Sequence, residues 1–189
     1  NPEHAHARKG LVMMEKRRPE IEAEKNKLNG HSIRFSYATV PGLDNGPTDD
    51  YGGYVTEADG SWQWEITYVK HNFKTEESRL GWLIGGGWFI AFNAGEDEYE
   101  EDYDGIGLGM IFQAGGAARV GEHLMFELSP YVGIGTNGLG GYGMYGIKAG
   151  AHVLLGHLGL GVEAGYHSFD AEVASGSGPR IAGVLAYTF

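Results

Sequence analysis

Cysteine is absent from this chain of 189 residues, and long apolar runs are scarce. Without cysteine, the chain has neither a disulfide framework nor a cysteine-ligated metal site. The most apolar stretch, residues 80–92, is shorter than the roughly 20 residues that a membrane-spanning helix needs, and three consecutive glycines lie at its centre. These absences argue against both a disulfide-stapled domain and a bundle of membrane helices.

Basic residues are also scarce over most of the chain. Residues 1–30 carry seven of the 14 Lys and Arg, so the rest of the chain has seven basic residues against 20 acidic ones. A surface with this excess of negative charge repels the phosphates of DNA and RNA. We therefore expect no nucleic-acid partner.

Glycine is abundant, at 33 residues, and from His31 onward side chains alternate along the chain with a period of two. The clearest example is residues 61–69, where Trp62, Trp64, Ile66 and Tyr68 share one face. Eight such segments are predicted strands, an even number that allows closure by up-and-down pairing. They are residues 32–40, 61–69, 80–92, 106–112, 124–134, 145–155, 158–168 and 180–189. The sequence predicts an all-β, eight-stranded antiparallel up-and-down barrel over residues 31–189.

Side-chain volume decides which face of this barrel points outward. A soluble barrel and a membrane barrel give the same alternation with the faces exchanged. Here one face holds large aromatic residues, too bulky for the lumen of eight strands, and the other is mostly Gly, Ala and Ser with isolated charges. The large side chains therefore face lipid, which predicts a transmembrane β-barrel. The aromatic residues of the outward face are Trp62, Trp64, Trp82, Trp88, Phe112, Phe126, Tyr187 and Phe189.

The predicted connections alternate in length, as in barrels with long external loops and short periplasmic turns. The external ones are expected at residues 41–60, 95–104, 135–141 and 170–178. The periplasmic ones are expected at residues 71–79, 114–122 and around Gly156 and His157. Both ends of the barrel sequence then lie on the periplasmic side.

The inward face carries six charged residues, three of each sign. Charges in a narrow lumen are tolerated when they are paired and hydrogen-bonded. We expect a cross-lumen network that plugs the barrel; the alternative is that each charge meets trapped water near a rim. The six residues are Arg34, Glu65, Glu127, Lys148, Glu163 and Arg180.

The sequence ends in GVLAYTF, with Gly183, Leu185, Tyr187 and Phe189 at alternate positions. This ending resembles the C-terminal β-signal of outer-membrane proteins, which implies recognition by the barrel-assembly machinery. Residues 31–189 are similar in length, strand number and loop layout to the small barrels of the OmpA and OmpX kind. The resemblance implies a location in the bacterial outer membrane, in contact with its lipid and lipopolysaccharide.

One predicted external loop, GEDEYEEDYDG, is strongly acidic. Clustered carboxylates bind hard cations such as calcium when the backbone folds them inward, although the spacing is not that of an EF-hand. A solvated acidic loop is the alternative to a metal site. The carboxylates are Glu96, Asp97, Glu98, Glu100, Glu101, Asp102 and Asp104.

Residues 1–30 are predicted to form a polar, helical periplasmic segment interrupted at Pro19. This segment could dock onto a periplasmic or envelope protein, cap the barrel mouth, connect to a further domain, or be a flexible tail.

For function, we expect a structural or interaction role without a cofactor, as a plugged barrel and a possible subunit of an envelope complex. A small channel or a carrier of hydrophobic ligands is the alternative. A lipid A deacylase or acyltransferase is a further one, but the adjacent His167 and Ser168 point to opposite strand faces.

Overall fold

The computed structural model describes residues 13, 30–40, 57–74, 78–96, 102–136, 141–171 and 174–189. Within these ranges, no helix is long and apolar enough to cross a membrane. The helical segment predicted for residues 1–30 lies outside the described residues except at Met13 and Gly30. The division of the chain at residue 30 therefore stays a prediction.

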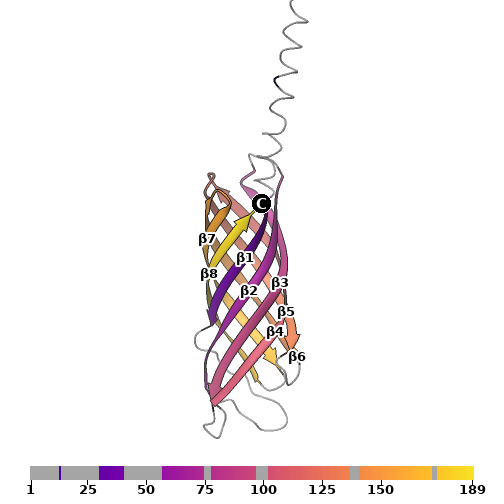
Figure 1. The fold of residues 1–189 in the computed structure, drawn as a ribbon, viewed down its shortest axis with the longest axis vertical. Coiled ribbons are helices and arrows are strands. Elements are labelled where there is room, and N and C mark those ends of the chain that lie inside the picture. The colour runs from indigo at the N-terminus through magenta and orange to yellow at the C-terminus, as the bar shows by residue number, and fades with distance from the viewer. Residues whose placement is uncertain are drawn as a thin grey trace, which may run out of the picture.

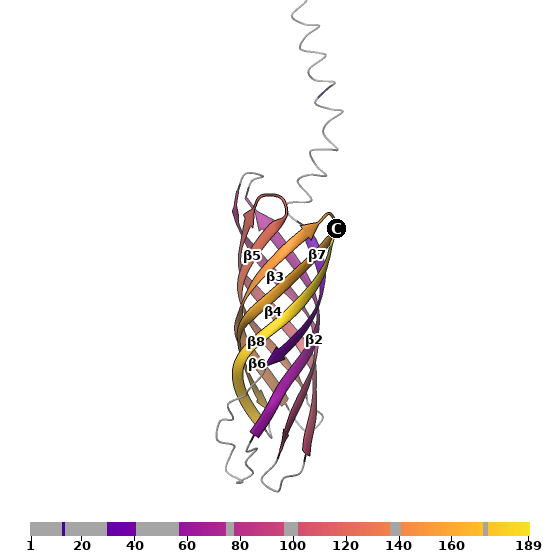
Figure 2. The same ribbon diagram turned by 90° about the vertical axis from the view of Figure 1, so that its left-hand side faces the viewer.

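Eight antiparallel strands pair in sequence order, and β1 pairs with β8 to close the sheet into a barrel (Figure 1). The predicted eight-stranded up-and-down barrel is confirmed. The strands are β1 (His31–Val40), β2 (Glu57–Phe73), β3 (Leu80–Glu96), β4 (Asp102–Val120), β5 (Leu124–Thr136), β6 (Gly141–Leu155), β7 (Leu158–Ala171) and β8 (Ala174–Thr188). Figure 2 shows that they wind around the barrel at an angle to its long axis.

Several predicted connections belong to strands instead. Residues 114–120 were expected to lie in a turn, yet β4 continues to Val120 and the turn is confined to residues 121–123, with Gly121 at φ +67°. Residues 174–178, expected in an external loop, pair with β7 through Ser168 and Ser177. Both segments are rich in small residues, which have a weak preference for strands, so the sequence does not indicate a strand there. The hydrogen bonds of a strand join backbone groups, and small side chains do not prevent them. The connections that follow β4 and β7 are therefore shorter than expected.

Side chains are distributed inside out relative to a soluble protein. Large apolar residues cover the outer wall, with Trp88 66% and Ile66 52% exposed, while Arg180 and Glu65 inside are each 1% exposed. In water such a wall would be a large exposed apolar surface, whereas in a bilayer it meets lipid, and closure of the sheet by β1 and β8 leaves no unpaired edge strand. The fold is therefore a transmembrane β-barrel, with the inward and outward faces that the sequence predicted.

Glycine allows the strands to approach closely where the barrel wall curves. A Cβ atom on Gly87 would lie 1.9 Å from the Ile66 carbonyl oxygen, and one on Gly109 would lie 2.2 Å from the Ile134 carbonyl oxygen. Such close approach of one backbone to another is a recognised use of glycine within strands. It explains how a glycine-rich sequence forms regular strands here.

Candidate functional site

The six charged residues predicted for the lumen all lie inside the barrel, on six different strands. Each occupies an inward position of its strand and is 8% exposed or less. β1, β2, β5, β6, β7 and β8 each contribute one, in the order Arg34, Glu65, Glu127, Lys148, Glu163 and Arg180. They associate in two groups, one around Glu127 and one around Glu65.

The Glu127 group joins opposite walls of the barrel. Arg34 on β1 donates two hydrogen bonds to Glu127 on β5, with Nη1 2.7 Å from Oε2 and Nη2 2.6 Å from Oε1. This bidentate geometry is the strongest form of an arginine–carboxylate pair. Two histidines complete the group, with His71 Nε2 2.7 Å from Glu127 Oε1 and His152 Nε2 3.6 Å from Glu127 Oε2.

The Glu65 group holds two acids and two bases. Arg180 bridges both acids, with Nη2 2.5 Å from Glu65 Oε1 and Nη1 3.1 Å from Glu163 Oε2. Lys148 Nζ lies 3.0 Å from Glu163 Oε2 and 3.7 Å from Glu65 Oε2. Gln63 donates a further hydrogen bond of 2.8 Å to Glu65. Formal charges therefore cancel within each group when the histidines are neutral.

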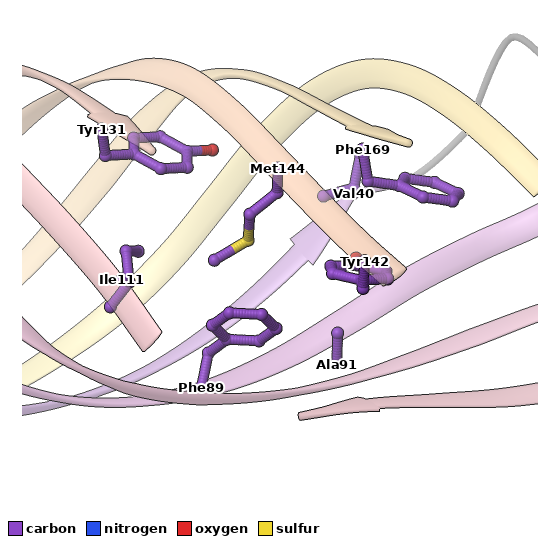
Figure 3. Close-up of a cluster of buried hydrophobic side chains, with 8 residues drawn as sticks. All are labelled: Val40, Phe89, Ala91, Ile111, Tyr131, Tyr142, Met144 and Phe169. Atoms are coloured by element: carbon purple, nitrogen blue, oxygen red, sulfur yellow. The ribbon is translucent and has the colours of Figure 1, made fainter. Parts of the chain in front are cut away.

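Clusters of buried apolar side chains lie inside the barrel on both sides of the charges. The external cluster lies toward the connected ends of the hairpins formed by β3 with β4 and β7 with β8, and Figure 3 shows its side chains pointing into the space enclosed by the strands. It consists of Val40, Phe89, Ala91, Ile111, Tyr131, Tyr142, Met144 and Phe169. The periplasmic cluster consists of Val69, Phe73, Leu83, Ala117 and Met125, with Leu154 packed against it. The ion pairs thus lie in a segment bounded by apolar material, where water competes weakly for them.

Tyr131 links the charges to the external cluster. Its hydroxyl lies 2.7 Å from His167 Nδ1, and the two rings stack with centroids 6.0 Å apart. The Arg180 guanidinium carbon lies 5.7 Å from the centre of the Tyr131 ring. This distance is within the range of a cation–π interaction.

Sequence reasoning missed one member of the network. His71 was assigned to a predicted connection, although it continues the inward positions of β2 after Thr67 and Val69, and that alternation could have identified it. His152 shares the inward face of β6 with Lys148, as the alternation of the sequence indicates, and its contact is with Glu127. The partners depend on the register of every strand around the barrel, which the sequence does not specify.

The acidic residues predicted as a possible cation site lie at and between the ends of β3 and β4. Glu96 ends β3, Asp102 and Asp104 begin β4, and Glu96 is paired in register with Asp102. Asp97, Glu98, Glu100 and Glu101 lie outside the described residues. No group of metal-binding side chains occurs in the part of the chain that the structure describes. A cation site in this loop stays a prediction.

β8 carries three residues of the predicted assembly signal, and the fourth, Phe189, directly follows it. Gly183, Leu185, Tyr187 and Phe189 share the outward face, and the Phe189 amide donates to the His31 carbonyl oxygen at 2.9 Å. On β7, His167 is buried inside while Ser168 lies on the outer wall. These two residues therefore do not form a shared site.

No family model matches the sequence, and no curated protein matches it. Solved structures to which the chain is similar include the following three. Ail, the attachment invasion locus protein of Yersinia pestis in complex with the heparin analogue sucrose octasulfate, is 12% identical, with a TM-score of 0.48 over 85% of this chain and 99% of that one. The outer membrane protein OprG from Pseudomonas aeruginosa is 14% identical, with a TM-score of 0.32 over 85% and 96%. The outer membrane protein AlkL is 12% identical, with a TM-score of 0.35 over 85% and 90%.

The inside-out arrangement of this barrel is itself that of a bacterial outer-membrane protein. A closed antiparallel sheet of eight strands, an apolar outer wall and a polar interior occur together in that class. The chain is an integral outer-membrane β-barrel.

Proposed function

We propose that this chain is a non-conducting outer-membrane barrel with a structural or interaction role. The observation that supports the proposal is the pairing of all six lumen charges, three of each sign, in two groups between two apolar clusters. An ion crossing the barrel would have to break buried pairs and enter two apolar zones, and both steps are costly. The lumen is then a plug that stabilises the barrel.

The partners we propose contact the outside of the barrel. The outer wall meets outer-membrane lipid and lipopolysaccharide, and the outward residues of β8 are presented to the barrel-assembly machinery during insertion. An envelope complex would be reached through the external loops or through residues 1–30. We propose no enzymatic activity, because lipid A chemistry requires a nucleophile and a base that converge on one face. His167 and Ser168 lie on opposite faces.

Conductance in planar lipid bilayers tests the plugged lumen. The refolded chain is expected to give no discrete current steps under conditions in which a water-filled porin, added as the positive control, gives clear ones. Regular current steps from the wild-type chain would support the alternative of a small channel and contradict the proposal. Glu127→Ala, which unpairs Arg34, is the variant in which leakage is expected first.

A further inference from the structure

An apolar groove of about 540 Å³ lies on the outer wall across β5, β6 and β7. Two adjacent rows of outward side chains form its sides. Val132, Tyr145 and Ser168 are register partners in the row nearer the external end, and Pro130, Ile147 and Tyr166 are register partners in the next row. The backbone of Gly146 runs between the rows, with the buried Tyr131 behind it.

The groove begins at a proline within a strand. Pro130 has no amide hydrogen, and the pairing of β4 with β5 is interrupted between the Gln113–Tyr131 and Gly116–Leu128 pairs. The outward residues of β4 beside this gap are small, Ala114 and Gly116. Elsewhere on the wall, large side chains such as Trp88 and Ile66 project into lipid. The small side chains beside Pro130 leave room on the outer wall for a flexible chain.

Polarity changes along the groove. Its external end gathers hydroxyl groups, because the Tyr166 hydroxyl donates to Ser177 Oγ at 2.9 Å and Ser177 is the register partner of Ser168. The opposite end is purely apolar at Pro130 and Ile147. The lining contains no lysine or arginine that would bind a phosphate. This gradient matches a fatty acyl chain, whose ester or amide carbonyl accepts hydrogen bonds and whose tail is apolar.

We propose that the groove binds one acyl chain of an outer-leaflet lipid. The Tyr145 and Ser168 hydroxyls contact its ester or amide carbonyl, and the tail runs over Gly146 toward Pro130 and Ile147. The occupant is a lipid because the groove lies in the wall that the bilayer covers, among side chains such as Tyr145 and Val132 that are 61% and 55% exposed. The site is outside the lumen, so the proposal is independent of whether the barrel conducts.

Photo-crosslinking in nanodiscs tests this site on the whole refolded chain. The discs contain phosphatidylethanolamine and phosphatidylglycerol, with a small fraction of phosphatidylethanolamine that carries a diazirine on one acyl chain. After illumination, mass spectrometry locates the adducts. We expect about fivefold more adducts on the β5 and β6 segments around Val132 and Ile147 than around Ile66 on β2, on the opposite wall. An excess of about fivefold corresponds to the free energy of burying one or two additional methylene groups.

Two tryptophan substitutions separate the groove from general lipid contact. Val132→Trp fills the groove and is expected to remove the excess of adducts there. Val162→Trp, which adds the same ring to the outer wall of β7 outside the groove lining, is expected to preserve it. Ile147→Trp serves as a second blocking variant if Val132→Trp does not show the heat-modifiable migration of a folded barrel.

A double variant tests the proposed contacts of the Tyr145 and Ser168 hydroxyls. Tyr145→Phe combined with Ser168→Ala leaves the shape of the groove nearly unchanged, and it is expected to lower the excess of adducts without changing the fold. Adducts spread evenly around the barrel, an excess that survives both blocking variants, or crosslinks to a second protein chain in place of lipid would each overturn the proposal.

Discussion

At the scale of single residues, buried pairs of opposite charges join the strands across the lumen. Glu127 accepts two hydrogen bonds from Arg34 and contacts His71, and each of these side chains is buried. The attraction within a buried pair offsets the cost of desolvating both charges only while both partners are present. Removing one partner therefore destabilises the barrel more than removing both.

Glu127→Ala is expected to lower the free energy of unfolding by about 3–5 kcal/mol, because it leaves the Arg34 guanidinium buried without a counter-charge. Urea unfolding in lipid vesicles, followed by tryptophan fluorescence, measures the change. Glu122→Ala, at an exposed turn position, is the control and should change stability by less than about 0.5 kcal/mol. The Arg34→Met, Glu127→Leu double variant should recover part of the loss, and equal stability of Glu127→Ala and wild type would contradict this account.

Gly146 is expected to tolerate no side chain. A Cβ atom there would lie 2.3 Å from the Tyr166 carbonyl oxygen and 2.6 Å from the Tyr131 hydroxyl, whereas one on Gly183 would meet nothing within 4 Å. Gly146→Ala should therefore destabilise the barrel by about 1–3 kcal/mol through overpacking, and Gly183→Ala should not. The same unfolding assay compares them. Similar losses for both variants would show that glycine acts through general strand propensity instead.

At the scale of strands, the sequence predicts most where large and small side chains alternate. Trp62, Trp64 and Ile66 face outward against Glu65 inward, and this contrast predicts both β2 and its orientation. The second half of β4 has small residues on both faces and offers no such contrast, so a turn was predicted in place of strand. The pairing of Arg34 with Glu127 could not be predicted, since it depends on closure of the barrel and on the register of each strand between them.

The depth of an outward position in the bilayer is expected to decide the cost of a charge there. Ile66→Arg places a guanidinium near the middle of the apolar wall of β2 and should cost about 2–4 kcal/mol, while Thr39→Arg, at the external end of β1, should cost about 0–1 kcal/mol. Unfolding in vesicles of the same lipid gives both values. If arginine lowers the free energy of unfolding more at position 39 than at position 66, the bilayer does not cover the part of the barrel that this account assigns to it.

At the scale of the whole molecule, the barrel is a stack of layers inside a lipid-facing wall. The periplasmic cluster, the two charged groups and the external cluster follow one another along the lumen between the turn end and the loop end. Each layer is formed by side chains from several strands, so every strand is tied to strands that it does not pair with. If these layers fill the lumen as proposed, interaction is left to the outer wall, loops and rims.

The most direct test of the inside-out barrel is a cysteine scan of β2. The chain has no cysteine of its own, so each introduced cysteine is the only one that is labelled. Single cysteines at positions 62–69 are labelled in the unfolded chain with a small environment-sensitive fluorophore, refolded into vesicles, and quenched by a lipid with bromine on its acyl chain. We predict strong quenching at 62, 64, 66 and 68 and weak quenching at 63, 65, 67 and 69. The opposite phase, or quenching without alternation, would contradict the inside-out barrel.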